Sequence, residues 1–138
     1  MGNDLPEFDL KLRAYGIGVG DWQTVSAWHE ARHGKPLPET ILPPLGIIVE
    51  DSAGPVAALF AGQYVGIGIA VADTFITRPG IGPRALRIGR RALDGLVAVL
   101  RETDYGLLRC FTSCETFGRA LLRFGFIADR GVYHLRIS

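Results

Sequence analysis

The sequence predicts a single α/β domain in which four strands precede a long central helix. In the first half of the chain, short apolar runs rich in β-branched and aromatic residues alternate with turn residues, a pattern typical of strands. In the second half, apolar residues recur at helical spacing over residues 84–102 and again at Phe117, Leu121 and Phe124. The chain has 138 residues, enough to bury one core of its own. We therefore expect one domain over residues 1–138.

The N-terminal part is expected to form a strand, a helix and a loop. Residues 10–18 have the composition of a strand. Asp21 is a candidate N-cap for a helix that ends at His33, before Gly34. Residues 35–44 contain four prolines, and each lacks an amide donor and restricts the residue before it. A loop is predicted there.

Three further strands are expected before the central helix. Residues 45–49 and 56–63 are apolar and are separated by acidic and small turn residues, which predicts a hairpin. Gly66 and Gly68 permit a second reversal, after which residues 69–77 form a fourth strand.

A strand, a helix and a hairpin should follow the central helix. Residues 107–111 are predicted to form the strand. Thr112 and Glu115 have the spacing of a capping box, and the helix that they begin should end at Gly125. Residues 127–138 can form a terminal hairpin, which would leave an edge strand able to pair in a homodimer.

Composition excludes several classes of protein. The net charge is only +1, so nothing in the overall balance favours nucleic acid or a membrane surface as a partner. Residues 54–72 carry no charge and could span a bilayer by length, but their glycines favour two buried strands. Cys110 and Cys114 are too few for a disulfide framework, which favours a reduced, cytoplasmic protein.

The central helix, predicted over residues 84–102, has an unusual charge distribution. Cations at a helix N-terminus oppose the helix dipole, yet four arginines crowd the first turns. A bound phosphate would resolve this conflict, because free amides and guanidinium groups would converge on its oxygens. A solvated basic face is the other interpretation. The four residues are Arg84, Arg87, Arg90 and Arg91.

The order of elements resembles the GNAT superfamily of acyl-CoA-dependent N-acetyltransferases over nearly the whole chain. Residues 84–89, Arg-Ala-Leu-Arg-Ile-Gly, are similar to the family's Arg/Gln-x-x-Gly-x-Gly/Ala turn, and Gly125-Phe126 matches the pair that ends its last helix. The resemblance implies a mostly antiparallel mixed sheet that splays after the fourth strand, with helices on both faces. It also implies acetyl-CoA or another acyl-CoA as cosubstrate and an amine or protein acceptor.

The resemblance assigns roles to individual residues. Asp73, on the fourth strand, would be the general base for the amine. Cys114 or Tyr133 would protonate the leaving group, because Leu121 stands where many members of the family have a tyrosine. The residues that would contact the acyl-CoA lie on the fourth strand and at the start of the central helix: Phe75, Ile76, Thr77, Arg84, Arg87, Ile88, Gly89 and Arg90.

Two departures from the family pattern keep a second interpretation open. Arg87 replaces the turn glycine that lets the backbone approach the pyrophosphate, and Leu121 cannot donate a proton. Gly80 and Gly82 offer another phosphate turn, although Pro83 removes one donor. A GNAT-fold binding or structural protein without catalysis is the alternative. Residues 42–46 are similar to small phage-encoded GNAT-like proteins, for which a virion-associated location would follow.

A third interpretation concerns zinc. His29-Glu30-Ala31-Arg32-His33 is a His-Glu-x-x-His pattern on a predicted helix, as in zinc metalloproteases. Such a site needs a third ligand, and the only other histidine is His134, on the last predicted strand. We therefore expect no metal.

Overall fold

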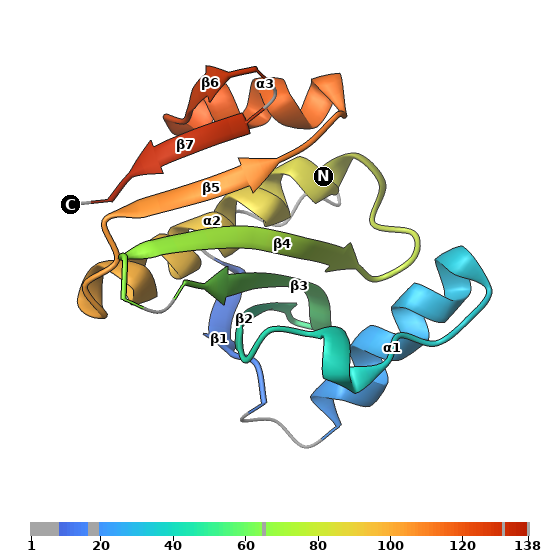
Figure 1. Cartoon of the computed structure of the whole chain (residues 1–138). Coiled ribbons are helices and arrows are strands. Elements are labelled where there is room, and N and C mark those ends of the chain that lie inside the picture. The colour runs from blue at the N-terminus through green and yellow to red at the C-terminus, as the bar shows by residue number, and fades with distance from the viewer. Residues whose placement is uncertain (1–8, 17–19, 65, 131, 138) are drawn as a thin grey trace.

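A computed structural model describes residues 9–16, 20–64, 66–130 and 132–137. Its strands form one seven-stranded sheet in the order β1-β2-β3-β4-β5-β7-β6 (Figure 1). The elements along the chain are β1 Lys11–Ala14, α1 Asp21–His33, the 3₁₀ turn η2 Glu39–Ile41, β2 Leu45–Asp51, β3 Gly54–Gln63, β4 Ile69–Thr77, the 3₁₀ turn η3 Gly82–Arg84, α2 Ala85–Glu102, β5 Leu107–Phe111, α3 Glu115–Phe124, β6 Ile127–Asp129 and β7 Val132–Arg136.

The sheet is mixed and mostly antiparallel, as the sequence predicts. The hairpins β2–β3 and β3–β4 and the terminal β6–β7 pair are antiparallel. Strands β4 and β5 are parallel, because helix α2 forms a crossover connection between them. The crossover returns the chain to the end of the sheet at which β4 begins. The prediction of four strands before the central helix is therefore confirmed.

Strand β4 departs from its neighbour β5 halfway along its length. Ala61 of β3 lies opposite Ala72, whereas the adjacent Phe60 lies opposite Thr74, so Asp73 is an extra residue in β4. A bulge of this kind bends a strand and increases its twist. The pairing of β4 with β5 ends at Ala72 opposite Cys110, and the rest of β4 separates from β5. The predicted splay after the fourth strand is thus present, and the bulge gives its physical cause.

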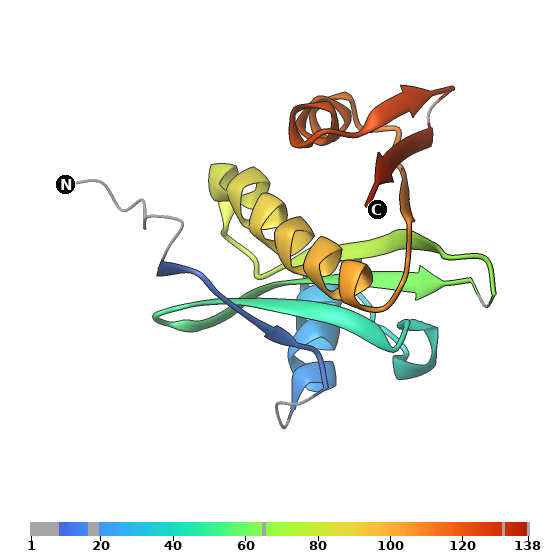
Figure 2. The ribbon, with the colours of Figure 1, turned by 90° about the vertical axis from the view of Figure 1, so that its left-hand side faces the viewer.

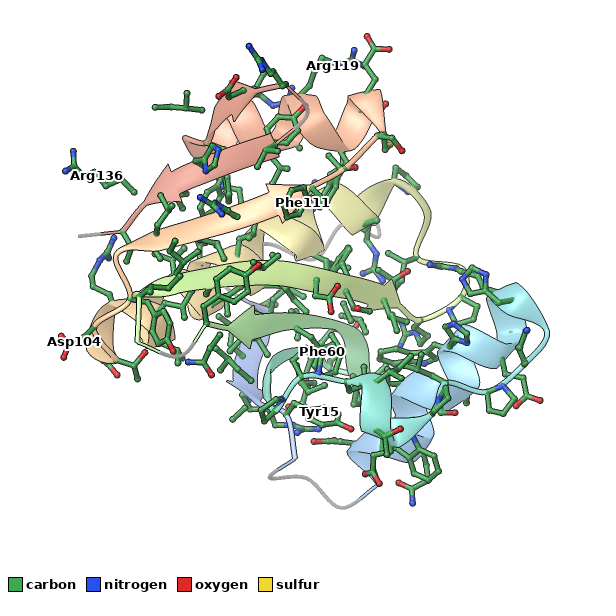
Figure 3. All side chains as sticks on the ribbon, viewed as in Figure 1. Tyr15, Phe60, Asp104, Phe111, Arg119 and Arg136 are labelled. Carbon is green, nitrogen blue, oxygen red and sulfur yellow. The ribbon has the colours of Figure 1, made fainter. Side chains whose placement is uncertain are left out.

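Helices cover both faces of the sheet, and each face has its own core (Figure 2). Alternate residues of β2 point to opposite faces: Ile47 and Val49 to the α2 side, Ile48 to the α1 side. On the α1 side, the ring of Tyr15 packs edge-on against that of Phe60, with centroids 4.8 Å apart (Figure 3). The α1-side core consists of Val25, Trp28, Leu37, Ile48, Ala58, Phe60 and Ile76.

Both predicted helix ends at glycine are confirmed. Gly34 follows α1 in the left-handed conformation, and its amide donates to the carbonyl of Glu30. Gly125 follows α3 with a φ of 123° and donates to the carbonyls of Leu121 and Leu122. A residue with a Cβ would strain both positions, so the local sequence alone determines these two ends.

Both predicted side-chain caps are wrong. Asp21 is the first residue of α1, the cap position is Gly20, and the Asp21 carboxylate instead binds Arg13. Thr112 does not cap α3, because its hydroxyl accepts the amide of Cys114 in a local turn and Glu115 is the first helical residue.

The other boundary differences are small. The predicted loop over residues 35–44 contains the 3₁₀ turn η2. The first strand is shorter than residues 10–18, and residues 17 and 18 lie outside the described part of the chain, as does Gly131 of the terminal turn. The uncharged segment 54–72 folds into β3 and the start of β4, and no helix of the described residues has the length and apolarity to cross a bilayer.

Candidate active site

A small cavity lies where β4 and β5 separate. Its volume is about 60 Å³, and the exposed carboxylate of Asp73 stands at its edge. The rings of Phe75 and Phe117 stack across it with centroids 6.4 Å apart and planes 8° from parallel. The predicted base therefore lies at the one opening that the sheet topology creates. The lining residues are Leu59, Ala72, Asp73, Thr74, Phe75, Gly89, Leu93, Cys110, Phe111, Phe117 and Leu121.

A larger cavity of about 240 Å³ lies between α2 and α3. It shares Gly89, Leu93, Phe117 and Leu121 with the small cavity, so the two cavities adjoin each other. We call the two adjoining cavities the groove. The groove has the concave, largely apolar character of a small-molecule site. The lining residues of the larger cavity are Leu86, Arg87, Gly89, Arg90, Leu93, Phe117, Ala120, Leu121, Arg123 and Phe124.

Gly89 keeps the groove open where the two cavities meet. A Cβ at this position would lie 3.4 Å from the Phe75 ring, tighter than most contacts of its kind. The glycine thus lets α2 lie close to β4 while Phe75 keeps its stacked position. This is a packing role, and it explains why a small residue occurs at the last position of the predicted 84–89 motif.

The four predicted arginines separate into three groups. Arg91 pairs with Asp94 on its own helix, at 3.5 Å. Arg87 and Arg90 line the larger cavity, where Arg123 of α3 joins them. Arg84 instead lies 3.8 Å from the carboxylate of Asp51, which also binds Arg78 at 3.7 Å. The guanidinium of Arg84 therefore anchors the start of α2 to the β2–β3 turn. Sequence reasoning missed Arg123, because it lies on a different helix and no local pattern distinguishes it.

The backbone at the start of α2 offers fewer free amides than the sequence predicts. The 3₁₀ turn η3 extends α2 at its N-terminal end, and the amide of Ala85 donates to the carbonyl of Gly82. Pro83, inside this turn, has no amide hydrogen. The donors for an anion at this site would thus come mainly from the arginine side chains around the groove.

Two residues of the cavity wall are chemically inert. Leu121 is fully buried and contributes only apolar surface. Burial raises the pKa of the Cys110 thiol to about 11, so this side chain remains a neutral thiol at physiological pH. Asp73 is the only carboxylic side chain in the described lining of the small cavity.

The two candidate acids lie outside the groove. Cys114 is exposed at the N-terminus of α3. The hydroxyl of Tyr133 points at Gly118 of α3, so closely that a Cβ there would collide with it. Neither residue is among those that line the two cavities.

Replacing Tyr133 with phenylalanine should leave the turnover rate within a few-fold of the unmodified protein. The hydroxyl contacts α3 rather than the groove, so its loss removes no group from the cavity wall. Steady-state kinetics with an acyl-CoA and an amine would measure this. A loss of kcat beyond about tenfold would make Tyr133 a proton donor, since removal of such an acid costs about 10² or more.

The contact between the Tyr133 hydroxyl and Gly118 can be tested by its effect on stability. Gly118→Ala should lower the free energy of unfolding by about 1–3 kcal/mol through overpacking. Adding Tyr133→Phe should recover part of that loss, because it removes the atom that the new methyl group meets first.

The described residues offer no zinc centre. The rings of His29 and His33 are neighbours, with centroids 4.6 Å apart, but Nδ1 of His29 contacts the carbonyl of Lys35 at 2.8 Å. His134 lies on β7, opposite Arg109 of β5. Across the described ranges, no three His, Cys, Asp or Glu residues cluster in a way that could hold a metal ion.

Comparison of the whole fold with solved structures identifies it. An acetyltransferase of the GNAT family from Desulfovibrio desulfuricans has a TM-score of 0.71 at 15% sequence identity, with 94% of this chain and 99% of that chain covered. The ribosomal-protein-S18-alanine N-acetyltransferase of Escherichia coli gives 0.70 at 14%, with 94% of each chain covered.

A third similar structure contains CoA. It is a GNAT family N-acetyltransferase from Escherichia coli in complex with CoA, with a TM-score of 0.69 at 14% identity, covering 99% of this chain and 86% of that one. No protein-family model matches the sequence, and neither does any curated protein. The chain therefore has the fold of the GNAT N-acetyltransferases, as the residue pattern predicts.

Proposed function

We propose that this protein is an acyl-CoA-dependent N-acyltransferase that transfers an acetyl group to an amine. One observation carries the proposal: the larger cavity between α2 and α3 adjoins the small cavity at the β4–β5 opening, and Asp73 lines that small cavity. A thiol-linked cosubstrate in the groove would thus meet an amine beside a base. The small volume of the inner cavity, about 60 Å³, favours a short acyl group.

Each part of the site has a role in this reaction. Arg87, Arg90 and Arg123 bind the phosphates of CoA, and the unpaired edge of β4 at Phe75–Thr77 holds the pantetheine arm. Arg32 fixes this edge, because its Nη2 donates to the buried Thr77 hydroxyl at 2.7 Å. Of the remaining residues of the sequence-based site, Gly89 lines the groove, whereas Arg84 pairs with Asp51 and Ile88 is buried in the core.

The chemical step follows from the position of Asp73. Asp73 takes a proton from the amine, whose nitrogen then forms a bond to the thioester carbon. The carbon–sulfur bond breaks, and CoA leaves as a thiolate that takes a proton from solvent, because neither Cys114 nor Tyr133 lines the groove. Most of the rate comes from positioning the two substrates and from strand amides that polarise the thioester carbonyl.

Acetyl-CoA should raise the melting temperature of the protein. At a hundred times its dissociation constant, a ligand that binds only the folded state adds about 2.7 kcal/mol of stability. Differential scanning fluorimetry with acetyl-CoA, CoA and adenosine 3′,5′-bisphosphate would measure the shift. The bisphosphate is the control, because it carries phosphate groups without the pantetheine arm.

The binding-protein alternative gives a different result. Leu121 in place of a tyrosine and the hydrogen-bonded amide of Ala85 favour a GNAT fold that has lost its cosubstrate. In that case neither acetyl-CoA nor CoA shifts the melting temperature, and the acyltransferase proposal fails. A phage origin, suggested only by residues 42–46, stays a prediction.

A further inference from the structure

On the α1 face of the sheet, the described residues leave β5, β7 and the adjoining part of β4 uncovered. In Figure 1, α2 and α3 lie behind β4, β5 and β7, and the opposite face of these three strands points to the viewer. Leu108 and Cys110 of β5 point to the helices, so Arg109 and Phe111 point to this face. Figure 3 shows Phe111 there, 58% exposed. We call Val71, Arg109, Phe111, Val132 and His134 the open face.

The open face leads directly to the candidate base. Phe111 belongs both to the open face and to the lining of the small cavity, where Asp73 stands at the edge. The CoA groove approaches the same cavity from the opposite, helix-covered side of the sheet. An acceptor amine that reaches Asp73 would therefore come across the open face.

Arg109 is the residue of this face that most needs a partner. It is half-buried between Val71 on β4 and His134 on β7. Its Nε is buried and has no hydrogen-bond partner among the described residues. A buried guanidinium nitrogen without an acceptor is unfavourable. A carboxylate on the open face would stabilise this cation through charge-assisted hydrogen bonds to the rest of the guanidinium.

The charges around Arg109 favour an acidic ligand. His134, directly across from it on β7, adds a second basic group, and Arg136 follows at the far end of that strand. The acidic residues on the same side are Asp73, at the cavity, and Asp129, on the outer strand β6 beyond β7. The centre of the face is thus basic, and it is bordered by apolar side chains.

We propose that the acceptor is an extended polypeptide whose reactive amine lies at Asp73 and whose neighbouring acidic side chain binds Arg109; this inference rests on the acyltransferase function proposed above. Arg109 and Phe111 are two residues apart on β5, or about 7 Å along the strand. That spacing suits a glutamate or aspartate one or two residues from the amine in an extended chain. Phe111 and the two valines would contact the apolar parts of the same segment.

A polypeptide fits this face better than a small amine. The cavity at Asp73 holds only about 60 Å³ and cannot enclose a metabolite of any size. The open face beside the cavity is a sheet surface, so a ligand there must gain its affinity from many contacts distributed over that surface. An extended segment supplies such contacts, whereas a free amino acid could use only Arg109.

Two peptides that differ only in charge would test the inference. Both carry the same free α-amine and apolar residues, with glutamate at the second position in one and glutamine in the other. We expect kcat/KM with acetyl-CoA to be about tenfold higher or more for the glutamate peptide. Arg109→Gln should reduce this ratio to about one, and Arg109→Lys should retain part of it.

Arg119→Gln is the matched control, because Arg119 lies on the outer side of α3 in an exposed pair with Glu115 (Figure 3). It removes the same charge and should keep the peptide preference. Each variant is first checked for folding by its melting shift with acetyl-CoA. A small primary amine, tested beside the peptides, should be acetylated at equal rates by the unmodified protein and by Arg119→Gln.

The outcomes separate the polypeptide-acceptor inference from the acyltransferase function on which it rests. Equal rates for the two peptides, or a preference that survives in Arg109→Gln, overturns the role of Arg109 and leaves the acyltransferase function in place. If the small amine is acetylated and neither peptide is, the polypeptide acceptor is overturned and the acyltransferase function remains. A failure of all amines together with no acetyl-CoA binding removes both proposals.

Discussion

Replacing Asp73 with asparagine should lower kcat for acetyl transfer by about 10²- to 10⁴-fold while acetyl-CoA still raises the melting temperature. Asparagine keeps the size of the side chain but cannot accept the amine proton. Asp73 is exposed at the bulge of β4, so its loss leaves no buried charge and should not unfold the strand. Steady-state kinetics and melting with acetyl-CoA, measured on the same preparation, would separate chemistry from binding.

The acceptor itself offers a sharper version of this experiment. An amine whose conjugate acid has a pKa below the assay pH arrives already deprotonated and needs a base less. For such an acceptor, the decrease in kcat caused by Asp73→Asn should be smaller than the decrease measured with an alkyl amine. Asp94→Asn is the control, because Asp94 is exposed on α2 and pairs only with Arg91 on its own helix. Full turnover by Asp73→Asn with an alkyl amine would remove Asp73 from the reaction.

The elements of this fold were accessible to sequence reasoning because their signals are local. Gly34 and Gly125 end helices by their own backbone conformation, and the stripe of Leu93, Leu96 and Leu100 faces the sheet as helical spacing requires. In each case the relevant residues lie within one or two turns of one another.

The site was less accessible because its geometry depends on pairing across the chain. The bulge that places Asp73 at the opening exists only in the register between β3 and β4. The ion pair between Arg84 and Asp51 joins segments that are far apart in the sequence, so no local pattern predicts it. Arg123 reaches the groove only because α3 packs beside α2. Long-range contacts of this kind leave no periodic pattern in the sequence.

Asp21 illustrates the same limit in the stability of the fold. As a helix-capping residue it would contribute about 1 kcal/mol. In the structure it is buried, and both of its carboxylate oxygens accept hydrogen bonds from Arg13 at 2.7 Å, with the amide of Gly16 as a third donor at 2.9 Å. The bond to Asp21 raises the pKa of the Arg13 guanidinium above its ordinary value. These contacts join β1 to the start of α1.

Asp21→Ala should therefore lower the free energy of unfolding by about 3 kcal/mol, at the lower end of the range for breaking a buried pair. The lower end applies because Arg13 keeps a second partner, Glu50, at 3.2 Å from its Nε. Urea denaturation would measure the change, with Asp94→Ala as an exposed control expected to lose less than about 1 kcal/mol. In a double-mutant cycle, Arg13→Ala should add little to Asp21→Ala, because the two side chains act as one unit. A loss below 1 kcal/mol for Asp21→Ala would mean that Asp21 acts only as a surface residue, and that α1 is held to the sheet by its apolar side chains alone.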